Sequence, residues 1–220
     1  VADSTGNGHA GTDNGTVAVP GRVGQARQFD GVARYIDVGD PSSLEGMFAG
    51  GGSVSAWVRP SSLGGGNFGR VVDASTALNF ANGWGLVTDG GANAQQAWSF
   101  ARDMATGFAL WATEPGTVAI GDWQHVAVTH DEDGTDSPAL FLDGVSQTVV
   151  VLTPPQGAFD SIAGSPMRIG NRASATDRGL DGDLDELRFS ASPRSAGWFD
   201  AQYRSMTDSM VTCDAEQSIR

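Results

Sequence analysis

Short strand-like runs separated by turn-forming residues dominate this sequence and exclude most other architectures. Apolar and polar residues alternate within the runs, and Gly, Asn, Asp or Pro fills most of the gaps. The runs lie near residues 24–29, 34–38, 52–59, 70–73, 84–88, 96–102, 108–113, 123–130, 139–142, 146–152, 167–170 and 181–189. Helical periodicity is nearly absent. The pattern therefore predicts an all-β sandwich of two antiparallel sheets.

Two local patterns predict side-chain directions and a turn. The Ser53–Arg59 segment alternates cleanly between apolar and other residues. Its Val54, Ala56 and Val58 should therefore face the core, because successive side chains of a strand point to opposite faces. Asp143-Gly144 stands between two strand runs, and this dipeptide predicts a tight β-hairpin.

One short helix is expected near the C-terminus, over residues 193–205. Ser192 would be its N-cap and Pro193 its first residue. Phe199 and Tyr203 are four residues apart and would share one face of the helix. The sequence is thus divided into one domain, residues 1–206, and a C-terminal tail, residues 207–220.

Composition limits the partners. The formal net charge is −13, and every basic residue is Arg. An acidic surface repels nucleic acid and anionic membranes, so neither is expected as a partner, and no apolar run is long enough for membrane insertion. The single cysteine, Cys213, lies in the tail and has no partner for a disulfide within the chain.

The acidic segment Gly179–Ser190 alternates like a half-buried strand and carries four carboxylates between Asp181 and Glu186. With other segments it resembles the laminin-G-like, concanavalin A-type jelly roll of bacterial multi-domain surface proteins. The segments that carry this resemblance, in order, are 3–12, 20–31, 35–38, 53–60, 123–131, 140–144, 179–190 and 193–203. The resemblance implies a jelly-roll sandwich with a short C-terminal helix.

The resemblance also implies a structural Ca²⁺, because sandwiches of this type often hold one with an Asp of the last strand and groups of the N-terminal turns. Ca²⁺ prefers six to eight oxygen ligands. The ligands that match by position are Asp3, Asn7, Asp30, Gly31 and Asp185. The alternative is that Asp185 and Glu186 pair with Arg188 or cap a turn.

Hydrolysis is not expected. Retaining glucanases of this fold use two carboxylates about 5 Å apart, usually from a Glu-x-Asp-x-Glu type of pattern. The five Glu residues form no such pattern. Asp181, Asp183 and Asp185 have the spacing, but by resemblance they belong to the closing strand rather than the catalytic one. The sequence therefore predicts a protein that is not an enzyme.

The six tryptophans divide into two groups. Trp57, Trp123 and Trp198 occupy positions that the resemblance assigns to the framework, and a core location is expected for them. Trp84, Trp98 and Trp111 lie in the less patterned middle of the chain and are the candidate ligand-binding residues, as rings of a sugar platform. Burial in the core is the alternative for this second group.

Taken together, these features predict a non-catalytic binding module, located outside the cell or in the bacterial cell envelope, whose partner is a glycan or a surface protein. An architectural domain of a larger surface protein, without a small ligand, is the alternative. A divergent polysaccharide hydrolase is the interpretation that the sequence favours least. The family usually has a strand before the Asp3 turn, so a strand from the upstream parent chain, or from a neighbouring chain, is expected at this edge.

Overall fold

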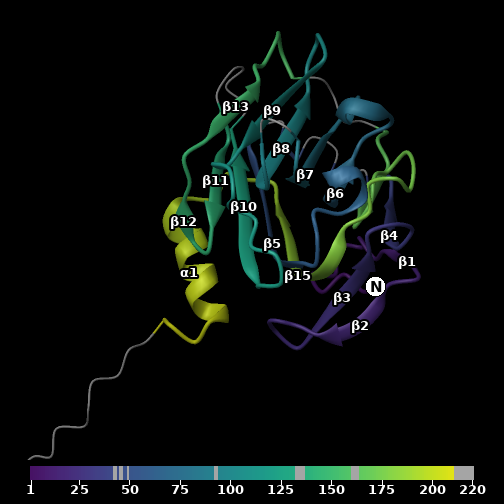
Figure 1. Ribbon diagram of the computed structural model, residues 1–220, viewed down its shortest axis with the longest axis vertical. Coiled ribbons are helices and arrows are strands. Elements are labelled where there is room, and N and C mark those ends of the chain that lie inside the picture. Colours follow the sequence, from purple (N-terminus) through teal and green to yellow (C-terminus); the bar gives the residue numbers. More distant parts are fainter. Residues whose placement is uncertain are drawn as a thin grey trace, which may run out of the picture.

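The chain forms two stacked antiparallel β-sheets and one α-helix in a computed structural model that describes residues 1–41, 44, 47–48, 50–91, 94–131, 137–159 and 164–210 (Figure 1). The eight-stranded sheet has the spatial order β1 (Thr12–Asn14), β4 (Tyr35–Gly39), β14 (Met167–Ile169), β6 (Arg70–Ala74), β7 (Trp84–Asp89), β8 (Ala97–Asp103), β9 (Phe108–Ala112) and β13 (Val150–Thr153). The seven-stranded sheet has the order β12 (Val145–Ser146), β11 (Ala139–Leu142), β10 (Gln124–His130), β5 (Gly52–Pro60), β15 (Asp181–Ser190), β3 (Gln25–Asp30) and β2 (Val17–Pro20). This confirms the predicted two-sheet, all-β architecture.

The main hydrophobic core fills the space between the two sheets. Val54, Ala56 and Val58 of β5 all belong to it and are fully buried, which confirms the direction predicted from their alternation. β10 and β15 flank β5 and place Val126 opposite Ala56 and Leu184 opposite Val58. Rows of apolar side chains from three neighbouring strands therefore close one wall of the core.

The Asp143-Gly144 hairpin is confirmed. The two residues connect β11 to β12, and Leu142 pairs with Val145 directly across the turn. Both turn residues have positive φ, 51° and 79°, as the two-residue turns that fit the twist of a hairpin require. The Asp143 carboxylate also accepts a hydrogen bond from the backbone N–H of His125, at 2.9 Å, which ties the turn to β10.

The single helix, α1 (Ala196–Met206), packs on the outer face of the seven-stranded sheet (Figure 1). Its N-cap is Ser195, whose side chain accepts a hydrogen bond from the N–H of Trp198. The predicted N-cap, Ser192, is wrong by one turn. The reason is that the chain before the helix is fastened to β5: Ser53 Oγ donates to the Ser192 carbonyl, at 3.1 Å, and accepts from the Arg194 N–H, at 2.8 Å.

The strand predictions hold with two exceptions. The predicted strand over residues 146–152 is two strands, because the chain leaves β12 in one sheet and enters β13 in the other. The sequence does not predict β1 and β2, since β1 has three polar residues, β2 has only four residues and ends at a proline, and both lie at sheet edges. Two short 3₁₀ turns, η1 (Gly65–Asn67) and η2 (Leu78–Phe80), also belong to the fold.

The two ends of the chain bear on the remaining predictions. Val1 exchanges backbone hydrogen bonds with Gly11, next to the edge strand β1. A further strand from another chain segment at this edge stays a prediction. Cys213, with most of the predicted tail, lies outside the described residues.

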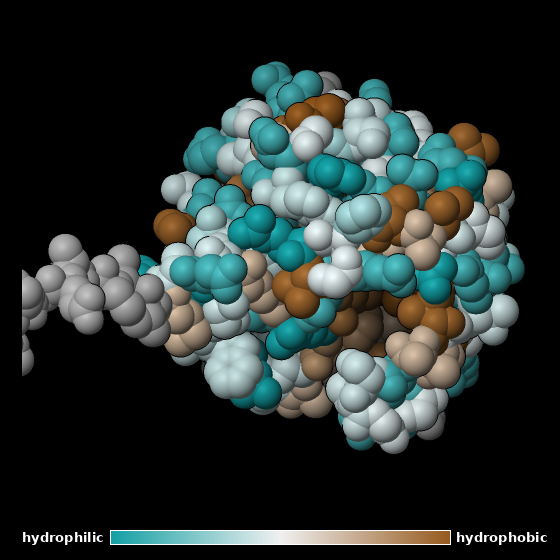
Figure 2. Space-filling view, turned by 90° about the horizontal axis from the view of Figure 1, so that it is seen from below, coloured by the Kyte–Doolittle hydropathy of each residue, from teal (hydrophilic) through white to brown (hydrophobic). Residues whose placement is uncertain are grey.

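Hydrophilic, intermediate and hydrophobic residues are mixed over the lower end of the molecule, where a hollow opens on hydrophobic residues (Figure 2). Hydrophobic residues are therefore visible from outside at this end of the sandwich (Figure 2). No described helix is long and apolar enough to cross a membrane.

Candidate functional site

The predicted sugar platform is wrong, because the rings of Trp84, Trp98 and Trp111 point inward. Each of the three side chains is 0% exposed and lies in the core between the sheets. Trp98 donates from its indole nitrogen to Gln124, at 3.3 Å, and Phe100 stacks on Trp111 with ring centroids 6.3 Å apart. Buried rings cannot present a face to a sugar, and the residues between them on the same strands point to the opposite, outer face of the sheet.

That outer face of the eight-stranded sheet carries a second, smaller apolar cluster. It consists of Phe80, Val87 and Ala101, with Phe108 and Leu110 packed against it. Val87 and Ala101 are as completely buried as the core between the sheets. This burial arises because the η2 segment lies over the strands, and Phe80 covers them.

A β-bulge places two charged side chains of β6 together. Arg70 pairs with Val87 and Val72 with Leu86, so Val71 is an extra residue in β6. Without the bulge, positions three apart in a strand would point to opposite faces. With it, the guanidinium of Arg70 reaches the carboxylate of Asp73, with Nε and Oδ2 3.2 Å apart. The regular alternation of side chains along a strand would not predict this pair from the sequence.

Asp73 fastens two loops to the sheet. Its Oδ1 accepts a hydrogen bond from the hydroxyl of Ser75, at 2.6 Å, and another from the N–H of Ala173, at 3.2 Å. Ser75 begins the segment that leads to η2, and Ala173 lies in the loop between β14 and β15. The carboxylate is fully buried, and this burial raises its pKa, although the neighbouring Arg70 opposes the shift.

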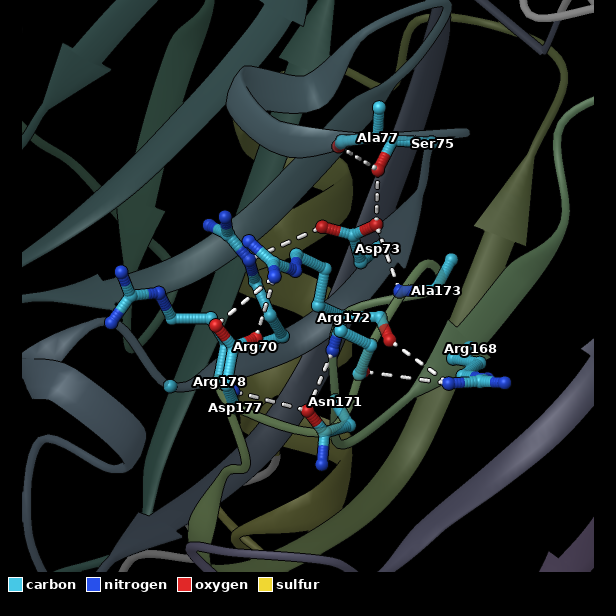
Figure 3. A network of polar contacts seen from close by, with 12 residues as sticks. Arg70, Asp73, Ser75, Ala77, Arg168, Asn171, Arg172, Ala173, Asp177 and Arg178 are labelled. Atoms are coloured by element: carbon cyan, nitrogen blue, oxygen red, sulfur yellow. Dashed lines mark hydrogen bonds and ion pairs between the residues drawn. The ribbon is translucent and has the colours of Figure 1, made fainter.

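The β14–β15 loop adds further guanidinium groups. Arg172 forms an ion pair with Asp177, with Nη2 and Oδ1 2.9 Å apart, and Asn171 accepts the N–H groups of Arg172 and Arg178. In Figure 3 the guanidinium groups of Arg70 and Arg172 lie between the carboxylates of Asp73 and Asp177, whereas that of Arg178 points away. We call the five charged residues Arg70, Asp73, Arg172, Asp177 and Arg178 the arginine cluster.

Several polar atoms of the arginine cluster have no hydrogen-bond partner among the described residues. In the part of the chain that the structure describes, Nη1 of Arg70 and Nε of Arg172 have no polar partner, whereas Nε of Arg70 and Oδ2 of Asp73 form no hydrogen bond but face each other in the 3.2 Å ion pair. Burial lowers the pKa of Arg70 to about 10, with the positive charges of Arg178 and Arg172 adding to the effect and Asp73 opposing it. Unsatisfied buried guanidinium donors are costly, so this arrangement is a candidate for recognition of acceptor atoms of a ligand.

The guanidinium of Arg70 also lies over the ring of Phe80, with Cζ 4.0 Å from the ring centroid. Beneath the ring lies Gly85, where an added Cβ would come within 2.5 Å of the Phe80 ring. We call the space that the ring occupies the Phe80 socket, with Gly85, Val87 and Ala101 as its floor and Phe108 and Leu110 beside it. Sequence reasoning did not identify this socket, because its residues come from four separated segments.

The residues predicted to hold Ca²⁺ are not gathered into one site. Asp30 is opposite Asp181 in the β3–β15 pair, and Asp185 lies four residues further along β15, roughly 13 Å away at about 3.3 Å per residue. Asp185 instead accepts the N–H groups of Val23 and Glu186, at 2.8 and 2.9 Å. This is the turn-capping alternative.

The other predicted ligands also have local tasks. Oδ1 of Asp30 accepts three backbone N–H groups in the turn that includes Gly31, from residues 32–34. Asp3 accepts from Thr5 and His9, which holds its pKa at about 2, and Asn7 lies in the same N-terminal turn. Across the described part of the chain, no three His, Cys, Asp or Glu side chains lie close enough to hold a metal ion. The five residues do not fit one Ca²⁺, and calcium binding stays a prediction without a ligand set.

The acidic strand places three carboxylates on the outer face of the seven-stranded sheet, and each has its own partner. Asp183 forms a salt bridge with Arg59, at 2.6 Å, and Asp181 accepts from Ser62 Oγ, at 2.7 Å. Asp185 holds the β2–β3 turn as described above. These carboxylates therefore fasten neighbouring segments to β15 rather than forming an acid–base pair.

The tryptophans expected in the core have three different environments. Trp57 is buried beneath α1, where it stacks on Tyr203 with ring centroids 5.5 Å apart. Trp123 is partly exposed and faces Arg59. Trp198 is 51% exposed, and the guanidinium of Arg194 lies 4.3 Å from its ring centroid. The core prediction is therefore confirmed for Trp57 and wrong for Trp123, which lies just before β10, and for Trp198, which the N-terminal turn of α1 directs to solvent.

A shallow groove of about 450 Å³ lies between the β11–β12 turn and the second half of α1. Its lining residues are Asp143, Val145, Asp200, Tyr203, Arg204, Thr207 and Ser209. The charged groups of Asp200 and Arg204 pair with each other, at 2.8 Å. This exposed pairing makes the groove a weaker candidate than the arginine cluster.

Comparison with known proteins agrees with the observed architecture. A family model described as the concanavalin A-like lectin/glucanases superfamily matches residues 6–198. No curated protein matches the chain closely enough to count as a relative.

Three solved structures illustrate the likeness. The binding domain of Paraclostridial Mosquitocidal Protein 1 aligns with a TM-score of 0.70 and 15% identity, over 92% of this chain and 49% of the toxin chain, so the match spans about half of that chain. Domain 4 of AbnA, a GH43 extracellular arabinanase of Geobacillus stearothermophilus, in complex with arabinotriose, aligns with a TM-score of 0.61 and 19% identity, over 90% of both chains. CBM40 of the Ruminococcus gnavus IT-sialidase, bound to α2,3-sialyllactose, aligns with a TM-score of 0.60 and 13% identity, over 87% of this chain and 98% of that one. At these identities the likeness shows the fold alone.

Proposed function

Because the chain belongs to the concanavalin A-like lectin/glucanase superfamily, we propose that it is a non-catalytic binding module whose ligand is a glycan. The fold alone does not assign a ligand. The proposal is supported by solved structures of the same fold, two of which contain an oligosaccharide. The proposed binding surface is the outer face of the eight-stranded sheet, at the arginine cluster.

One observation carries the proposal. The arginine cluster joins buried guanidinium donors that have no hydrogen-bond partner in the described structure to the apolar Phe80 socket. Sugars are recognised by this combination, since their rings have apolar faces and their hydroxyl groups need donors and acceptors. Arg178 is partly exposed, and its guanidinium points away from the two ion pairs (Figure 3), so a ligand at the rim of the arginine cluster could contact it.

A binding role rather than hydrolysis is supported by the carboxylates. Asp73 pairs with Arg70, and Asp177 pairs with Arg172. A retaining or inverting glycosidase instead needs one carboxyl group as a proton donor and a second as a nucleophile or base. Both carboxylates of the arginine cluster are engaged in ion pairs with guanidinium groups, an arrangement that fixes the two arginine side chains in place.

The test is binding to a glycan array by the purified chain and by two charge-matched variants. Arg178→Ala removes a positive charge at the cluster, and Arg204→Ala removes one on the distant, exposed helix α1. We expect binding that Arg178→Ala weakens and Arg204→Ala leaves unchanged. Binding to no glycan on the array would contradict the proposal and favour the architectural alternative.

The proposal includes an extracellular or cell-envelope setting, where glycan polymers are the available partners. The net charge of −13 is compatible with a neutral polymer or with an acidic one bound at a local basic cluster. Fractionation of cells that produce the protein would test this part of the proposal. Recovery in the cytosolic fraction alone would contradict it.

A further inference from the structure

The ring of Phe80 shows what kind of group the Phe80 socket accepts. One edge of the ring, Cδ1 and Cε1, lies against Gly85, which has no side chain, and the guanidinium of Arg70 lies over the ring. Phe108 contacts it from the side, with ring centroids 6.1 Å apart. A six-membered ring of this size is close in footprint to a pyranose, whose apolar face stacks on such surfaces.

The segment that carries Phe80 is held in an unfavourable backbone conformation. Phe80 has φ of +62°, and its neighbours Asn79 and Asn82 have φ of +57° and +54°. Asn tolerates this left-handed region, but a bulky residue rarely adopts it. Burial of the ring stabilises the closed segment while the backbone strain opposes closure, so the two effects act against each other.

The polar atoms around the socket favour a negatively charged ligand. Two buried donor atoms, Nη1 of Arg70 and Nε of Arg172, have no hydrogen-bond partner in the described residues, while Nε of Arg70 and Oδ2 of Asp73 face each other in an ion pair. A ligand that satisfied them would need more acceptors than donors. A carboxylate supplies acceptors only and forms strong charge-assisted hydrogen bonds with guanidinium groups.

We propose that Phe80 is a plug that occupies the place of an acidic pyranose, and that the module binds uronate-containing glycans when the η2 segment swings away. The carboxylate of the sugar contacts Arg70, and the sugar ring takes the place of the phenyl ring above Gly85. This deepens the proposed function and rests on it. Because the binding-competent form is the open one, its apparent affinity is reduced by the fraction of closed molecules.

The experiment uses a trimer of α-1,4-linked galacturonic acid, its carboxyl-reduced neutral trimer, and calorimetric titration of each variant. Phe80→Ala removes the plug and should tighten binding of the acidic trimer by about tenfold or more. Gly85→Ala adds a methyl group to the socket floor, where it meets either ring, and should abolish binding. Leu78→Ala is the matched control, because this side chain of the same turn is 61% exposed.

Tighter binding of the acidic trimer by Phe80→Ala and loss of binding in Gly85→Ala would support Phe80 as a plug, provided that Leu78→Ala leaves binding unchanged and the neutral trimer does not bind. A merely structural role would weaken binding in both Phe80→Ala and Gly85→Ala, and that result would overturn the inference. If Phe80→Ala does not fold, Phe80→Leu replaces it, with a smaller gain expected and no gain as the contradicting result. If the acidic trimer fails to bind while the glycan array is positive, this inference is wrong and the proposed function stands.

Discussion

Acidification should destabilise the packing of α1 through one buried histidine, His125. Its ring is 1% exposed and contacts the rings of Trp57 and Tyr203, with centroids 5.4 and 6.5 Å apart. Neither ring nitrogen has a hydrogen-bond partner in the described residues. Burial, and to a smaller extent the charge of Arg188, lowers the pKa of His125 from 6.5 to about 4. The folded protein therefore holds this ring neutral.

The sign and size of the effect follow from this lowered pKa. The unfolded chain takes up a proton near pH 6.5, whereas the folded protein does so only near pH 4. Stability is thus fully present above pH 6.5 and is lost as the pH falls toward 4. At 1.36 kcal/mol per pKa unit, the loss is about 2 kcal/mol at pH 5 and about 3 kcal/mol at pH 4.

The assay is urea unfolding between pH 7 and pH 4, for the wild-type chain and for His125→Phe. The phenyl ring keeps the contact with Trp57 and has no polar atom to leave unsatisfied, so we expect the variant to be at least as stable at pH 7. The difference between the two free energies of unfolding should then widen by about 3 kcal/mol on acidification. Contributions of Asp73, Asp89, Asp143 and Asp185, whose pKa values are raised by burial, are common to both proteins and cancel.

A wild-type chain and a variant with parallel pH profiles would refute the reasoning. Such a result would mean that the His125 ring is reached by water or pairs with an acid when protonated. The closest charged groups to consider are Arg188, Arg22 over the Trp57 ring, and Asp143, which binds the His125 backbone. Asp143→Asn would show whether the carboxylate takes part.

Three further outcomes are expected. Trp57→Ala should cost about 3–5 kcal/mol of unfolding free energy because the ring is buried under α1, while Trp198→Ala should change it by only about 0.5 kcal/mol, and calorimetry of both variants checks the contrast. Asp185→Ala should lower the melting temperature by the same amount in Ca²⁺ and in EDTA, because its carboxylate binds two backbone N–H groups; a loss seen only in Ca²⁺ would instead restore the metal site. The chain should release no reducing sugar from β-glucans or polyuronates, and release that disappears on mutation of an Asp or Glu pair would contradict a binding role.

The sequence predicts the inner strands of the seven-stranded sheet well, because they have one face in the core and a distinct second face, whereas the two edge strands β2 and β12 are missed or merged with a neighbour. In β5 the alternation of Val54, Ala56 and Val58 with larger or polar residues is complete, and the structure follows it. Asp143-Gly144 needed no tertiary context, since its turn type follows from the two residues themselves. Predictions of this local kind were confirmed.

The middle of the chain was harder because β7 and β8 are buried on both faces. Trp84 and Leu86 face the main core, while Val87 lies in the second cluster, so no polar face distinguishes inside from outside. The sequence of such a strand does not alternate regularly between apolar and polar residues. The face to which its tryptophans point therefore cannot be predicted from the sequence. The wrong sugar platform came from this ambiguity.

The arginine cluster shows a second limit of prediction from sequence, which concerns the alternation of side-chain directions along a strand. Arg70 and Asp73 are three residues apart, and in a regular strand two such side chains point to opposite faces of the sheet. The extra residue Val71 shifts the alternation by one position, so Arg70 and Asp73 lie on the same face. Both valines of the bulge, Val71 and Val72, are buried in the main core. A bulge is specified by pairing with β7 and by packing on both sides, neither of which is encoded within the five residues of β6. The feature that creates the candidate site is therefore one that only the assembled sheet reveals.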